Sequence, residues 1–87
     1  MTVNFMKSEV IVPRLGSSDE SDEVEIVHWA KKVGDQIRKG EPLVEVETDK
    51  VTVEIEAPGS GTLKAIFIQE GERTRSGAVV GLIEGET

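Results

Sequence analysis

The sequence predicts an all-β domain made of two facing antiparallel sheets with roughly four strands each. Three observations lead to this prediction. Short runs of alternating apolar and polar residues recur along the chain, turn-forming residues separate them, and no segment keeps a helical period. With 87 residues and 3% aromatic side chains, the chain is expected to form one domain whose core is built from Val, Ile and Leu.

Six runs are expected to be strands, and two shorter runs are weaker candidates. The six cover residues 9–12, 24–30, 42–48, 51–57, 61–68 and 78–84, and the weaker two cover 36–38 and 73–75. Segments such as "RKGEP", "APGSG" and "QEGE" separate them. The domain is therefore placed at residues 9–84, with a flexible extension over 1–8 and a tail over 85–87 at which a linker would start.

The segment "VEVETDKVTVEIEA", residues 44–57, contains two alternating runs that meet at Asp49 and Lys50. If these two residues are the centre of a tight turn, Val46 faces Val53, so the apolar faces of the two runs match. The same register sets Glu45 opposite Glu54, a like-charge pair that costs a few tenths of a kcal/mol. The sequence thus predicts a hairpin with a single lysine at its tip.

An internal repeat relates two segments of the chain at an offset of 37 residues. "GDQIRKGEPLVEVET" begins at Gly34 and "GERTRSGAVVGLIEGET" begins at Gly71. Each copy is too small to bury its own apolar face, so the two copies are expected to pack against each other as two sheets with pseudo-two-fold symmetry. The position equivalent to Lys50 falls at the end of the chain, which places the turn and the termini at opposite poles.

Composition argues against several classes of function. The net charge of −7 argues against binding to phosphate backbones or to anionic membranes. No run approaches the roughly 20 apolar residues of a membrane span, and the chain has no cysteine for a disulfide or a thiolate metal site. We expect a soluble, monomeric domain without metal, located in the cytoplasm or, after removal of a presequence, in the mitochondrial matrix.

The segments "WAKKVGDQIRKGEPL" from Trp29 and "VEVETDKVTVEIEAPGSGTL" from Val44 closely resemble the lipoyl domains of 2-oxo acid dehydrogenase complexes. The resemblance covers residues 9–84 and is most specific at the Asp-Lys turn. It implies a flattened β-barrel, and a non-catalytic carrier domain that belongs to or associates with a dihydrolipoamide acyltransferase. It also implies that Lys50 carries lipoate in amide linkage, with Asp49 and Val51 forming the turn that presents it.

Lipoylation of Lys50 would produce a swinging arm, because a lysine side chain is a long flexible stem ending in a nucleophilic amine. The dithiolane at the end of the arm accepts acyl groups and reducing equivalents. The resemblance implies four partners: a lipoate ligase or lipoyl transferase, a thiamine-diphosphate-dependent 2-oxo acid decarboxylase, the acyltransferase core and dihydrolipoamide dehydrogenase.

The loop "SSDESDEV" departs from the family pattern, because it is longer and more acidic than in most relatives. In the family this loop packs beside the lysine hairpin and contributes to partner choice. The residues assigned to partner recognition are therefore four acidic residues of this loop, together with one glutamate of the lysine hairpin: Asp19, Glu20, Asp22, Glu23 and Glu47.

Three alternatives remain open. A biotinyl domain shares the barrel and the lysine, but typically flanks that lysine with methionines, and Met1 and Met6 are both far from Lys50. A hydrolase with Glu45 and Glu54 as paired carboxylates would need a buried carboxyl group, which a solvated sheet face does not provide. The third alternative is an unmodified β module that binds proteins. Trp29 is expected in the core, and His28 on the surface without a catalytic partner.

Overall fold

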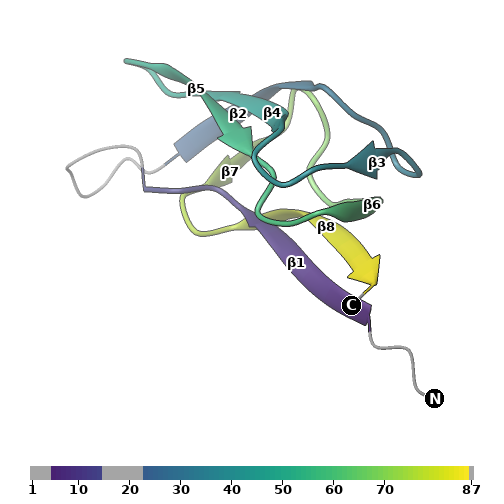
Figure 1. The fold of residues 1–87 in the computed structure, drawn as a ribbon. Helices are drawn as coiled ribbons and strands as arrows, with labels where there is room; N and C mark the ends of the chain where they lie inside the picture. Colours follow the sequence, from purple (N-terminus) through teal and green to yellow (C-terminus); the bar gives the residue numbers. More distant parts are fainter. Residues whose placement is uncertain (1–4, 15–22, 87) are drawn as a thin grey trace.

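The computed structural model describes residues 5–14 and 23–86, and within these ranges every regular element is a β-strand (Figure 1). The strands are β1 (Phe5–Ile11), β2 (Glu23–Trp29), β3 (Gln36–Ile37), β4 (Pro42–Glu47), β5 (Thr52–Glu56), β6 (Gly61–Ile66), β7 (Arg73–Arg75) and β8 (Val79–Glu86). They form two four-stranded sheets, with strand orders β1-β8-β6-β3 and β5-β4-β2-β7, and every pairing is antiparallel. The predicted all-β class and the two four-stranded sheets are confirmed.

The first strand and the last strand are longer than the alternation pattern predicts. β1 begins at Phe5 rather than at residue 9, and its pairing with β8 runs from Phe5 opposite Glu86 to Ile11 opposite Val79. Residues 5–8 and 85–86, which the pattern placed in an extension and a tail, thus belong to the backbone ladder. Alternation reports which side chains are buried, whereas backbone pairing continues past the core without an apolar pattern.

The internal repeat relates the two sheets to each other. The offset of 37 residues places β2, β3 and β4 on β6, β7 and β8, and the position of each strand in its sheet agrees with this match. Both halves also contain a bulge at the same place: the register shifts between Ile26 and His28 in β2 and between Leu63 and Ala65 in β6. Such coincident bulges show that the repeat extends to the irregularities of the backbone.

The fourth strand of each sheet comes from outside the repeat. β5 follows β4 through a hairpin, whereas β1 reaches the equivalent edge of the other sheet from the N-terminal side. The hairpin turn therefore corresponds to the position at which the other half has chain ends. Figure 1 shows the β4–β5 hairpin at the upper left, and the start of β1 and the end of β8 at the lower right, as the repeat predicts.

The core lies between the two sheets and is aliphatic except for one tryptophan. Its largest fully buried side chains include three pairs related by the repeat offset, Ile26 with Leu63, Leu43 with Val80 and Val46 with Ile83. The buried set is Val10, Val12, Val24, Ile26, Trp29, Ile37, Leu43, Val44, Val46, Ile55, Ala57, Leu63, Val80 and Ile83. Among the described residues, no polar or charged side chain is buried, so burial of apolar area is the main stabilising term.

Two glycines close the loops that follow the bulged strands. Gly34 and Gly71 have φ values of +100° and +87°, a region that L side chains rarely adopt. Their N–H groups donate to the carbonyl oxygens of Leu63 and Ile26, each at 2.8 Å. Each half of the domain is thereby tied to the bulge of the other half. The described part of the chain has no helix, and hence none that is long and apolar enough to cross a membrane.

Candidate functional site

The hairpin between β4 and β5 has the register that the sequence predicts. Val46 faces Val53, Val44 faces Ile55 and Glu45 faces Glu54. The valines and the isoleucine point into the core, with Val44 and Val46 at most 2% exposed. Because the apolar face is fixed on both sides of the turn, the two-residue tip is fixed as well. Asp49 and Lys50 are that tip.

A network around Thr48 closes the turn. The Thr48 N–H donates to the carbonyl oxygen of Val51 at 2.8 Å, which is the last backbone bond of the hairpin. The Thr48 hydroxyl oxygen accepts hydrogen bonds from the N–H groups of Lys50 and Val51, each at 3.1 Å. The hydroxyl lies 3.4 Å from the Val51 carbonyl oxygen, to which it donates. One side chain thus satisfies the backbone of both residues that follow Asp49.

Thr48 is a site residue that the sequence interpretation missed. A signal for it existed, since Ser and Thr hydroxyls commonly accept hydrogen bonds from backbone groups two or three residues ahead in a turn. The sequence interpretation instead assigned the turn to Asp49 and Val51. In the structure the Asp49 side chain forms none of the hydrogen bonds found among the described residues, and it lines a groove instead.

All three residues named for the attachment site are exposed. Asp49, Lys50 and Val51 follow one another along the surface of the tip, and Val51 is 44% exposed. Within the described part of the chain, the ion pairs of lysine are Lys31 with Glu41 at 3.2 Å and Lys64 with Glu84 at 3.8 Å. Lys50 takes part in neither, so its amine is available to a partner.

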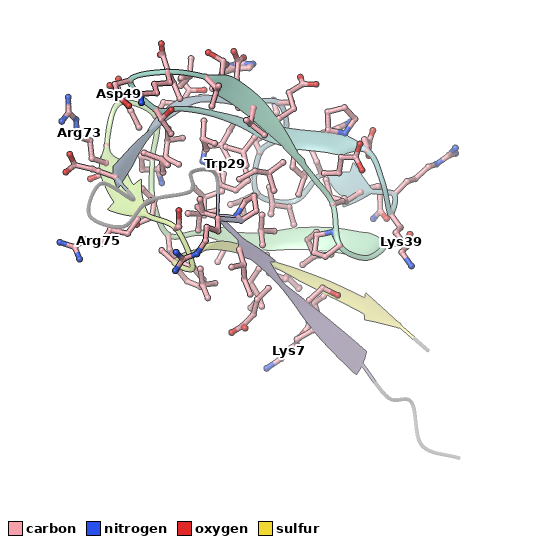
Figure 2. All side chains as sticks on the ribbon, turned by 90° about the vertical axis from the view of Figure 1, so that its left-hand side faces the viewer. Lys7, Trp29, Lys39, Asp49, Arg73 and Arg75 are labelled. Carbon is pink, nitrogen blue, oxygen red and sulfur yellow. The ribbon has the colours of Figure 1, made fainter. Side chains whose placement is uncertain are left out.

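An open groove runs along one side of the hairpin, between the turn and the edge of the sheet. Its walls come from the start of β2, the end of β4, the turn and β7. The lining residues are Glu23, Val24, Glu25, Glu47, Thr48, Asp49 and Arg73. Figure 2 shows Asp49 and Arg73 at the same end of the domain, away from Lys39. The groove therefore presents four carboxylates and one guanidinium next to the turn.

The groove brings together part of the set assigned to partner recognition. Glu23 and Glu47 both line it, and Glu23 also pairs with the Arg73 guanidinium at 3.3 Å. Glu25 and Arg73 belong to the same groove but were not predicted, because strand pairing across β2, β4 and β7 brings them there. Asp19, Glu20 and Asp22 lie outside the described residues.

The structure also places Trp29 and His28, the two other residues that the sequence analysis considered. Trp29 is 7% exposed, and its indole Nε1–H donates to the Ile68 carbonyl oxygen at 2.9 Å, which confirms a place in the core. His28 is exposed as predicted, and its Nδ1 lies 3.0 Å from Glu70 Oε2. That same carboxylate oxygen accepts a hydrogen bond from the Trp29 N–H at 2.9 Å, so Glu70 holds the backbone beside the β2 bulge.

Among the described residues, one carboxyl group has a pKa that is clearly shifted from its ordinary value. Glu41 accepts a hydrogen bond from the Arg38 N–H at 3.0 Å and pairs with Lys31, and these contacts hold its pKa below the ordinary value of 4.5. The contacts close the "RKGE" turn, which is separate from the lysine hairpin. Among the residues that the structure describes, no group of three or more His, Cys, Asp or Glu side chains is placed to hold a metal ion.

Comparison with known proteins supports the assignment that the hairpin suggests. Residues 8–83 match the biotin/lipoyl family, which is described as "Biotin-requiring enzyme". The chain belongs to this family. A solved relative is the lipoyl domain of the 2-oxoglutarate dehydrogenase complex from Azotobacter vinelandii, with 32% sequence identity and a TM-score of 0.67 over 86% of this chain and 98% of that one. Fold and sequence together therefore identify a lipoyl domain.

The relatives of this lipoyl domain are acyltransferase components. It is 41% identical over 75 residues to the "dihydrolipoyllysine-residue acetyltransferase component of acetoin cleaving system" of Bacillus subtilis. It is 43% identical over 79 residues to the "dihydrolipoyllysine-residue succinyltransferase component of 2-oxoglutarate dehydrogenase complex" of Bartonella vinsonii. These matches cover 86% and 91% of this chain but only 18% and 19% of the relatives. The lipoyl domain thus spans about a fifth of the length of the curated relatives.

Proposed function

We propose that Lys50 carries lipoate in amide linkage, and that the domain serves as a mobile carrier within a 2-oxo acid dehydrogenase complex. The observation that carries the proposal is the position of Lys50 at the tip of a hairpin whose register is fixed by buried residues on both strands. The ligase activates the carboxyl group of lipoate with ATP as an acyl adenylate, and deprotonated Nζ then attacks the carboxyl carbon and displaces AMP. The resulting amide removes the positive charge of the amine. Bound lipoate supplies a disulfide for acyl and electron transfer.

The surroundings of Lys50 fit such a group. Both neighbours of the lysine are exposed, and the residues of the turn leave the side chain without a counter-ion among the described residues. The hairpin lies at the end of the domain away from the start of β1 and the end of β8 (Figure 1). An arm on Lys50 would thus point away from anything attached to either end of the domain, as a carrier that visits several active sites requires.

The rest of the domain presents the lipoyl group to its partners and takes no part in catalysis. The carboxylates of the groove, together with Glu45, Glu54 and Glu56 on the outer face of β4 and β5, give the lysine end of the domain a negative surface. We infer that this surface is read by the ligase and by the decarboxylase, while the acyltransferase core and dihydrolipoamide dehydrogenase act on the arm. Complementary charge mainly raises association rates and suppresses wrong partners.

The test is modification of the intact domain by a lipoate ligase with lipoate and ATP. Intact mass should show one lipoyl group, and peptide mapping should place it on Lys50. Lys31, Lys32, Lys39 and Lys64 are internal controls, since they share the chain but not the hairpin tip. Modification at any of these lysines, or biotin in place of lipoate after incubation with a biotin ligase, would overturn the proposal. No modification by either ligase would favour the unmodified binding module.

A further inference from the structure

The turn that bears Lys50 is held differently from the loops of the repeat. At three of those loops a glycine of positive φ is followed by a carboxylate that accepts a backbone hydrogen bond: Asp35 after Gly34, Glu41 after Gly40, and Glu72 after Gly71, where the Gln69 N–H donates to Glu72 Oε1 at 2.7 Å. At the fourth loop Gly77 is followed by Ala78. The turn over residues 48–51 contains neither glycine nor proline. None of the described non-glycine residues has a positive φ, so this turn is not of the type I′ form common in two-residue hairpins.

A turn without glycine needs another partner for its backbone donors, and Thr48 supplies it. Its hydroxyl oxygen accepts from the N–H groups of Lys50 and Val51, both at 3.1 Å. These two N–H groups flank the Cα of Lys50 along the chain, so the hydroxyl restrains the peptide units on either side of the lysine side chain. Asp49 makes no such bond and faces the groove. Thr48 thus holds the turn through its hydrogen bonds, and Asp49 lines the groove beside it without taking part in them.

We propose that Thr48 is the positioning residue of the modification site. Its hydroxyl fixes the backbone direction at Lys50, and thereby the direction in which the amine leaves the hairpin toward a ligase. This inference rests on the proposed function, because it concerns the presentation of the same lysine. Without the hydroxyl the turn samples several backbone conformations, and only a fraction of the molecules present the amine correctly. The apparent affinity for the ligase falls in proportion to that fraction.

The size of the effect follows from the number of bonds lost. An exposed hydrogen bond changes a local equilibrium by a factor of a few. Loss of the two bonds that the hydroxyl accepts from Lys50 and Val51 therefore predicts a fall of roughly 5- to 10-fold in kcat/KM for lipoyl transfer. The change should lie mainly in KM, since a correctly presented amine reacts as before. Thr48 is half-buried at the surface and lies outside the core, so melting temperatures should differ little.

The experiment compares three variants of Thr48 with the parent domain. Thr48→Val keeps the shape but removes the hydroxyl, Thr48→Ala removes both, and Thr48→Ser keeps the hydroxyl. The matched control is Thr52→Val, which removes an exposed threonine hydroxyl one position beyond the turn for which the described residues offer no hydrogen bond. The readouts are kcat and KM of lipoyl transfer, and the amide hydrogen-exchange rates of Lys50 and Val51 measured by NMR below the melting temperature of every variant.

We expect slow transfer and faster amide exchange in Thr48→Val and Thr48→Ala, and near-parent values in Thr48→Ser and Thr52→Val. Equal kcat/KM in the parent and Thr48→Val would overturn the inference, although the proposed function would stand as long as Lys50 is modified. Thr48→Ser as slow as Thr48→Val would also overturn it, because the hydroxyl would then not be the cause. A parent domain that is not modified at Lys50 would instead defeat the proposed function.

Discussion

The contact between Trp29 and Gly81 provides a sharp test of how the two related halves fit together. The repeat places Gly81 where the first half has Val44, and Ile66 where it has Trp29. The cross-strand pairs are Trp29 with Val44 and Ile66 with Gly81. A Cβ atom added at Gly81 would lie 2.8 Å from the Cη2 atom of Trp29 and 3.2 Å from the Ala65 carbonyl oxygen. The absence of a side chain at Gly81 therefore makes room for the indole.

We predict that Gly81→Ala destabilises the domain. Ordinary contacts of a Cβ atom lie at 3.4–4 Å, so the ring must move by at least about half an ångström. The indole is 7% exposed and its N–H is bonded to Ile68, which limits such movement. Overpacking of this kind costs about 1–3 kcal/mol, and the lower chain entropy of alanine in the unfolded state offsets about 0.4–1 kcal/mol. The net loss of about 1.5 kcal/mol lowers Tm by roughly 6–12 °C.

Thermal melts of a double-mutant cycle separate the clash from other causes. Trp29→Phe removes the Cη2 atom, so Gly81→Ala should cost at least about 1 kcal/mol less in that background. The control is Gly40→Ala, a position with a φ of +87° and open space around the added Cβ. Its cost comes from backbone strain and should be the same with either residue at position 29. If Gly81→Ala melts at or above the parent, or costs the same with phenylalanine at 29, the packing explanation fails.

Four further predictions concern the lysine end of the domain, its partners and its acid stability. Lys50→Gln should abolish lipoylation and shift the stability by less than about 0.5 kcal/mol, which mass and circular dichroism will show together. Exchanging Asp49 and Lys50 should sharply lower the initial rate of lipoyl transfer at an unchanged Tm, because adjacent side chains leave the hairpin in different directions; equal rates would show that the ligase tolerates either position. Glu41→Gln should reduce the loss of stability that the parent domain shows as the pH falls below about 4.5. The contacts that lower the pKa of folded Glu41 stabilise the protein above the pKa of the unfolded state, and this stabilisation is lost as the pH falls through the pKa of the folded state. The same decrease of Tm with falling pH in both proteins would contradict this. Replacing four acidic residues by serine should alter reductive acylation by the cognate decarboxylase, and unchanged kinetics at low and high salt would make the loop an ordinary solvated segment. Those four residues are Asp19, Glu20, Asp22 and Glu23.

The sequence predicted the structure best where the alternation of apolar and polar residues follows which side chains are buried. Val46 and Val53 are apolar residues on either side of a two-residue gap, and a slip by one position would turn each apolar set outward. The register of the hairpin, and with it the place of Lys50, could therefore be read directly. The repeat supplied the relation between the sheets, because glycines such as Gly34 and Gly71 recur at turns that need a positive φ.

The features that sequence patterns did not reveal depend on geometry that forms only in the folded chain. The hydrogen bonds of Thr48 require the particular backbone of the turn, and the Asp-Lys pattern does not specify that backbone. The bond from the Trp29 N–H to Glu70 joins residues 41 positions apart across a bulge, and neither element contains a local signal for it. The groove next to the turn likewise needs β7 beside β2, a pairing between distant segments.

Comparison of the two related sheets also distinguishes the residues that the fold requires from those found only at the end of the domain that bears Lys50. The outer face of β2, β4 and β5 carries six glutamates, at positions 23, 25, 45, 47, 54 and 56, and the related positions of the other half hold Ser60, Thr62, Leu82, Glu84, Glu9 and Ile11. The pair Glu45 and Glu54 corresponds to Leu82 and Glu9, which face each other in the same way without like charges. The same architecture thus forms with two carboxylates in place of six, so the fold does not need the acidic face. Because a like-charge cross-strand pair is mildly destabilising, the charge on this sheet is better explained by what approaches Lys50 than by how the sheet is held together.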